Sequence, residues 1–252
     1  MNSATGDFST KVPEVTLVFW TIKVLATTLG EVGGDAVTMS LHLGYLLGTA
    51  IFATVFALAV AAQVRSRNFH AGRYWFTIIA STTVGTTLAD YADRSLGMGY
   101  AGGASLLLTL LVASLWLWYR ATGSLAVGSV DNPRSEWFYW LTITFSQTLG
   151  TALGDWVADT AGLGYTGGMV IFGSLLAGIA VLHIFRKAPE TALFWAAFIL
   201  TRPLGAVVGD FLDKPLAQGG LALSRYAGAA VLAAAIVLCV RFLPQRAAAK
   251  AH

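Results

Sequence analysis

The chain has 252 residues, of which 56% are hydrophobic and only 12% are charged, about half the charged share of an average soluble domain. Its net charge of +3 comes from basic residues in short segments between apolar runs, so a nucleic-acid-binding protein is excluded. A single cysteine, Cys239, excludes a disulfide framework and a thiolate metal site. The apolar runs have the length that crosses a bilayer, which indicates an integral membrane protein.

Eight such segments follow one another and predict an all-α membrane bundle of eight transmembrane helices. In chain order they cover residues 15–37, 43–64, 74–91, 100–119, 137–157, 165–185, 193–212 and 221–243. Residues 1–14 are expected to form a cytoplasmic N-terminus, 122–136 a linker and 244–252 a cytoplasmic tail. The first segment holds Lys23, Glu31 and Asp35 and is therefore not expected to be a cleaved signal peptide.

Basic residues mark the orientation of the bundle. They cluster after the second, fourth, sixth and eighth segments, whereas the other connections hold only Arg94, Lys214 and Arg225. The positive-inside rule therefore predicts that both termini lie in the cytoplasm.

Four copies of one pattern organise the chain. A tryptophan opens each odd-numbered segment, a glycine follows ten residues later, and an aspartate preceded by a small residue follows after fifteen. The tryptophans are Trp20, Trp75, Trp140 and Trp195, and the aspartates are Asp35, Asp90, Asp155 and Asp210. The repeats span 15–65, 66–121, 137–187 and 188–243. Each has two helices, so the four copies are predicted to be parallel, around an axis near the membrane normal.

This arrangement resembles a family of bacterial multi-pass "membrane-anchored" proteins built from four tandem repeats of unknown function. In that family each repeat has two transmembrane segments and a characteristic tryptophan, which Trp20, Trp75, Trp140 and Trp195 match here. The resemblance covers residues 13–243 and implies the fold and a location in the bacterial inner membrane, but no activity.

The tryptophans are expected to anchor the helices at the membrane interface, where amphipathic rings prefer to lie. The glycines form pairs of small residues one helical turn apart, which allow close packing between helices. They are Gly30 and Gly34, Gly85, Gly150 and Gly154, and Gly205 and Gly209, with Ala89 completing the second pair. This pattern predicts that the odd-numbered helices are the inner ones.

The four aspartates are the candidate functional residues, because carboxylates are costly inside a bilayer. Asp93, Asp159 and Asp213 lie about one turn further out, and Glu31 one turn deeper. These eight side chains could form an acidic site for a cation or for protons. Alternatively, the aspartates are structural and only bind neighbouring helix ends.

Further polar residues extend this stripe inward. Gln147 and Arg202 occupy equivalent positions in the third and fourth repeats, and Lys23 lies deeper in the first. Glu31 and Arg202 lie at similar depth and are predicted to form an ion pair if the first and last repeats are neighbours. Lys23, Arg202 and Gln147 would act as charge partners or gating residues. The charges of Lys23 and Arg202 leave open a zwitterionic or anionic substrate.

Enzyme signatures are absent from the sequence. The leading hypothesis is a secondary transporter or exchanger for a small cation, with Asp35, Asp90, Asp155 and Asp210 as metal ligands. Their oxygens suit Mg, Mn or Ca, and protons are the alternative cargo or coupling ion. No cofactor is required beyond a bound divalent cation as substrate. A scaffold or sensor is the alternative, and a redox enzyme is disfavoured. The bilayer is the expected partner, and a homo-oligomer remains open.

Overall fold

The computed structural model describes residues 10–249, so the outer parts of both predicted cytoplasmic ends, 1–9 and 250–252, lie outside the described residues. Within 10–249 the fold is all-helical, with one isolated bridge between Pro13 and Ala247. The long helices are α1 (Leu17–Asp35), α2 (Gly44–Arg65), α3 (Ala71–Asp90), α4 (Gly99–Thr122), α5 (Pro133–Asp155), α6 (Gly164–Ile184), α7 (Glu190–Asp213) and α8 (Arg225–Phe242). Short helical turns connect them: η1 (Ala36–Ser40), η2 (Tyr91–Ser95), η3 (Val127–Ser129), η4 (Trp156–Thr160) and η5 (Leu216–Gln218).

Five of the long helices, α2, α4, α6, α7 and α8, are long and apolar enough to cross a membrane. The other three, α1, α3 and α5, carry most of the threonines and carboxylates of the predicted stripe, and those side chains are buried inside the bundle. A polar helix can therefore occupy the centre, because its neighbours and not lipid surround it.

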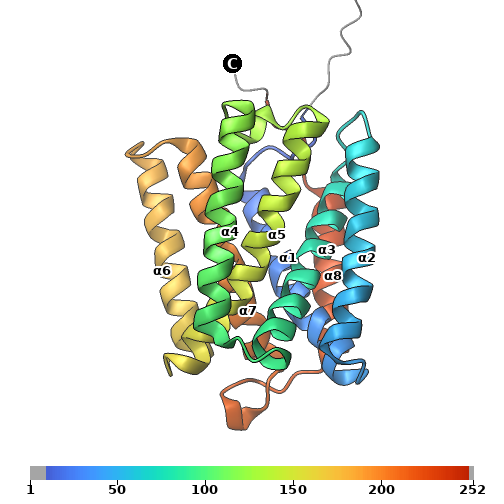
Figure 1. Cartoon of the computed structure of the whole chain (residues 1–252), viewed down its shortest axis with the longest axis vertical. Coiled ribbons are helices and arrows are strands. Elements are labelled where there is room, and N and C mark those ends of the chain that lie inside the picture. Colours follow the sequence, from blue (N-terminus) through green and yellow to red (C-terminus); the bar gives the residue numbers. More distant parts are fainter. Residues whose placement is uncertain (1–9, 250–252) are drawn as a thin grey trace, which may run out of the picture.

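The odd-numbered helices form a closed inner ring in the order α1, α3, α5, α7 and back to α1. Each even-numbered helix packs mainly against the odd helix of the following repeat: α2 on α3, α4 on α5, α6 on α7, and α8 on α1. The vertical packing of all eight helices is visible in Figure 1. The prediction that the odd helices are inner is confirmed. Each inner helix is covered by the outer helix of the preceding repeat, so neighbouring repeats interlock.

Glycine determines how closely the inner helices approach. A Cβ atom added to Gly30 would overlap Thr82, the residue seven positions after the tryptophan of the next repeat. The same relation joins Gly85 to Gln147, Gly150 to Arg202 and, closing the ring, Gly205 to Thr27. A second set one turn along packs Gly34, Gly154 and Gly209 against Thr86, Ala206 and Glu31. The glycine pairs therefore have the packing role predicted for them.

The repeat tryptophans differ from the prediction. Trp75, Trp140 and Trp195 are buried and Trp20 is half-buried, where interface anchors would face lipid. Trp195 Nε1 donates to the Leu125 carbonyl at 3.0 Å, and each ring packs edge-on against the aromatic residue before it. The aromatic residues that precede the tryptophans are buried, and together with the tryptophans they form one aromatic cluster: Phe19, Tyr74, Tyr139 and Phe194 with Trp20, Trp75, Trp140 and Trp195. The exposed aromatic side chains include Trp116, Tyr119 and Trp137, none of which is a repeat tryptophan.

The aromatic cluster fills the end of the bundle that carries both ends of the described chain (Figure 1). Tyr74 and Tyr139 share a hydrogen bond of 2.6 Å between their buried hydroxyls. Lys11 Nζ donates to the carbonyls of Gln63 and Val64 at the end of α2 and lies 2.5 Å from Glu136 Oε1 on α5. Packing therefore closes this end, and the opposite end carries the aspartates.

Candidate functional site: an acidic ring beside a buried arginine

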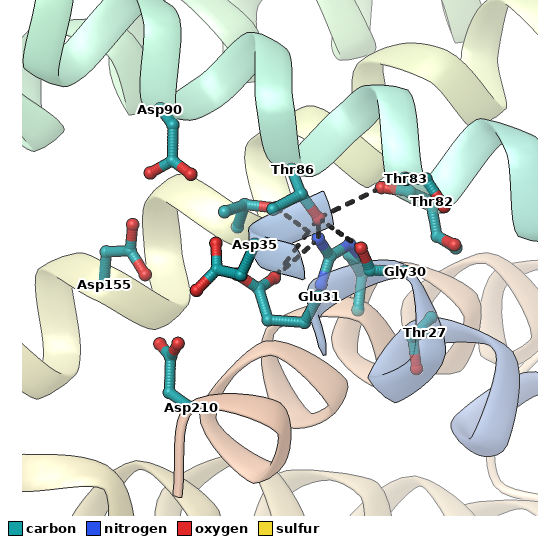
Figure 2. A network of polar contacts seen from close by, with 12 residues as sticks. Thr27, Gly30, Glu31, Asp35, Thr82, Thr83, Thr86, Asp90, Asp155 and Asp210 are labelled. Atoms are coloured by element: carbon teal, nitrogen blue, oxygen red, sulfur yellow. Dashed lines mark hydrogen bonds and ion pairs between the residues drawn. The ribbon is translucent and has the colours of Figure 1, made fainter. Parts of the chain in front are cut away.

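The repeated aspartates lie in the last turn of the four inner helices, as the final residue of α1, α3 and α5 and three residues before the end of α7. Asp35, Asp90, Asp155 and Asp210 are all buried, and Figure 2 shows them facing a common space from four directions. We call these four residues the acidic ring. In the first three repeats the aspartate is followed at once by a π-helical turn, η1, η2 or η4. Single π turns within α-helical segments often occur at functional sites.

Two basic side chains lie within the acidic ring, and each bridges two neighbouring repeats. Lys214 forms ion pairs with Asp35 and, at 3.1 Å, with Asp210. Arg94 Nε lies 2.8 Å from Asp90, and its Nη2 lies 3.6 Å from Asp155. Burial by itself lowers the pKa of Lys214, but the adjacent carboxylates reverse this effect and raise it well above its usual range. Lys214 therefore remains an ammonium ion.

The three outer aspartates, Asp93, Asp159 and Asp213, have different environments. Asp213 lies near Asp35 and Asp210, with ligand atoms of all three within 4.8 Å of one another, and it pairs with Arg225 at 2.5 Å. Asp93 packs beside Gly103 on α4, and Asp159 is exposed and accepts a bond from Tyr100 at 3.2 Å. The i→i+5 turns explain this difference, since a wider turn rotates the following residues off the stripe. Within residues 10–249 neither Asp93 nor Asp159 forms an ion pair with the basic residues of the ring, and their membership of the same site stays a prediction.

One turn below the ring, Arg202 contacts all three other inner helices. Its Nη2 donates to Glu31 on α1 at 2.9 Å, to Thr86 on α3 at 2.6 Å and to Thr151 on α5 at 2.5 Å. The arginine is fully buried, so it lies where the four helices converge. The ion pair expected between Glu31 and Arg202 is present, and it joins the first repeat to the last.

Deeper still, the remaining two polar residues of the predicted stripe are also fully buried. Lys23 Nζ lies 4.1 Å from the centroid of the Phe198 ring, and Gln147 packs against Gly85. Neither side chain has a hydrogen-bond partner within the described part of the chain. The site therefore consists of an acidic ring, an arginine–glutamate pair and an unpaired polar layer, in that order.

The repeat pattern does not reveal the basic members of this site. Lys214 and Arg94 lie in the connections between apolar segments, yet each stands four residues after a ring aspartate. That i,i+4 spacing is the signal that could have identified both pairs.

Comparison with known proteins agrees with the repeat pattern. The family described as Repeat of Unknown Function (DUF347) matches residues 18–69, 73–124, 138–188 and 193–246. No curated protein and no solved structure matches the chain. The four matches each contain one inner helix and the outer helix that follows it. The chain therefore belongs to the DUF347 family, as a tandem array of four of its repeats.

Proposed function

We propose that the chain crosses the bacterial inner membrane eight times, with both termini in the cytoplasm, and transports a small cation through the inner ring of helices. The four outer helices expose large apolar side chains, as contact with lipid requires. The polar residues of α1, α3 and α5 face inward and do not oppose their insertion.

The observation that carries the proposal is the convergence of four equivalent carboxylates on one space at one end of the bundle (Figure 2). Seven aspartates lie at this end of the molecule, Asp35, Asp90, Asp93, Asp155, Asp159, Asp210 and Asp213, against three basic residues, Arg94, Lys214 and Arg225. Such an acidic excess attracts cations, and carboxylate oxygens are the ligands that Mg²⁺, Mn²⁺ and Ca²⁺ prefer. Protons are the natural coupling ion for clustered carboxylates.

Lys214 and Arg94 take the place of a cation in this conformation. An ammonium ion already bridges Asp35 and Asp210, so an incoming cation must displace it to obtain both carboxylates. Below the ring, Arg202 presents a positive charge on the same path. Passage therefore requires the Glu31–Arg202 pair to open, which makes this pair the expected gate.

A scaffold is the second candidate, and the same ion pairs favour it. Each ring aspartate already has a basic partner, and both partners join neighbouring repeats. On this reading the ring holds the four repeats together and carries no ion.

Flux measurements separate the two candidates. The purified chain in proteoliposomes is tested with Mg²⁺, Mn²⁺ and Ca²⁺, with and without a pH gradient. We expect flux that Asp90→Asn and Asp155→Asn reduce at least tenfold, whereas Asp131→Asn, a carboxylate in the linker at the opposite end, leaves it unchanged. Absence of flux for all three cations from a correctly folded protein would refute transport and leave the scaffold.

A further inference from the structure

A buried layer of side chains extends from Arg202 to one helical turn below it, and several of its polar groups are unpaired within residues 10–249. Its eight members occupy equivalent positions in the four repeats, three and seven residues after each tryptophan: Lys23, Ile78, Ile143 and Phe198, then Thr27, Thr82, Gln147 and Arg202. All eight side chains are fully buried. The two threonines use their hydroxyls on backbone carbonyls, Thr27 on Thr201 at 3.2 Å and Thr82 on Ala26 at 3.1 Å.

The other polar members leave their donors free. Lys23 Nζ, Nε2 of Gln147, and Nε and Nη1 of Arg202 are donors without a partner among residues 10–249, and Oε1 of Gln147 is an acceptor without one. Only Nη2 of Arg202 is used. Buried polar groups are ordinarily paired, and leaving several donors unpaired in one place is costly. These donors belong to α1, α5 and α7, the helices whose Thr27–Gly205 and Arg202–Gly150 contacts bring them together at this level.

The charge of the layer does not balance. Arg202 is neutralised by Glu31, but Lys23 has no carboxylate within its own layer, where α3 and α5 contribute isoleucines. Among residues 10–249, the charged group that acts on Lys23 is Arg202 on α7, and it has the same sign. The Phe198 ring offers a cation–π contact, which is weaker than the cost of burying an ammonium ion away from water. Water could satisfy the free donors, but Lys23 would then have to lose its proton to avoid a buried, unpaired charge, whereas an anion both accepts from the donors and balances the charge.

We propose that this layer binds one small monovalent anion, a halide or a carboxylate group, between Lys23, Gln147 and Arg202. The ammonium ion supplies the opposite charge, the amide and the free guanidinium nitrogens supply directed hydrogen bonds, and Phe198 walls the site. This ligand is distinct from the cation proposed for the acidic ring, and the site does not depend on transport of that cation.

The test is the thermal stability of the purified full chain in detergent, at constant pH and ionic strength. Sodium chloride and sodium formate are titrated against sodium gluconate, whose anion is too large for the layer. A ligand that binds only the folded state raises its stability with concentration. We therefore expect a saturable rise in melting temperature with chloride or formate. Tighter binding of chloride would indicate a halide site, and tighter binding of formate a site for a carboxylate group.

Lys23→Met is expected to fold, because it replaces a buried charge with an apolar side chain of similar length, and to abolish this rise. Gln147→Leu should weaken anion binding at least tenfold. Lys187→Met removes an exposed lysine and serves as the matched control, with the response intact. Asp155→Asn, which alters the acidic ring, should also keep the anion response, so the two proposals can fail separately. A response equal in Lys23→Met and the parent chain, or no anion-specific response at all, would overturn the proposal.

Discussion

The ion pair between Glu31 and Arg202 gives the sharpest test of the inner ring. Arg202 is fully buried and Glu31 is nearly so, and the distance between Nη2 and Oε2 is 2.9 Å. Changing either residue alone to glutamine leaves the other charge buried without its partner, at a cost of about 3–5 kcal/mol. Changing both removes the two charges together. We expect the double variant to lose less unfolding free energy than the sum of the two single losses, by roughly 1–3 kcal/mol.

The assay is a double-mutant cycle on unfolding free energies, measured by denaturant titration in detergent micelles. Glu31→Gln combined with Lys187→Gln, an exposed residue, provides the control pair and should be additive within about 0.5 kcal/mol. Additive losses for the Glu31 and Arg202 variants would refute the claim that the first and last repeats are joined by this pair. Single losses below about 1 kcal/mol would refute the burial argument itself.

Three further outcomes are expected. Gly205→Ala places a methyl group onto Thr27 and should cost about 1–3 kcal/mol of unfolding free energy, whereas Gly178→Ala, with open space around it, should be neutral or slightly stabilising in the same denaturant titration. Lys214→Met frees the two aspartates that the lysine bridges, so calorimetry should show Mn²⁺ binding at least tenfold more tightly; unchanged affinity would mean that the lysine does not occupy a cation site. Burial raises the pKa of Glu136 from about 4.5 to about 7, although its partner Lys11 opposes this shift. The folded state therefore binds this proton more tightly than the unfolded state does. The unfolding free energy should fall as pH rises from about 4.5 to 7. Melting curves of Glu136→Gln should lack this fall, and an identical pH profile in both proteins would contradict the assignment.

Much of the fold could be predicted from the sequence because its signals are local and periodic. The length of the apolar runs, the fourfold spacing from tryptophan to glycine to aspartate, and the pairs of small residues together indicate four parallel copies with their odd helices inside. Where one helix of each copy carries the polar stripe, burial away from lipid favours placing that helix at the centre.

The errors arose where a side chain's environment depends on a neighbouring repeat. The tryptophans were expected at the lipid interface, but contacts with the aromatics of adjacent repeats bury three of them. Asp93 and Asp159 lie in π-helical turns, which the sequence pattern does not reveal and which change the angular position of the residues that follow.

The low share of charged residues by itself indicated a membrane protein, since a chain with so few charges cannot cover itself in water. The repeat spacing determined the number of units and which residues are equivalent. Only the tertiary structure decided how the charges are paired. The closed ring brings the fourth repeat against the first, so Arg202 contacts Glu31 and Lys214 contacts Asp35 across more than 170 positions of sequence. Spacing along a chain fixes which helix face a residue occupies, but the order in which helices close a ring decides which faces meet.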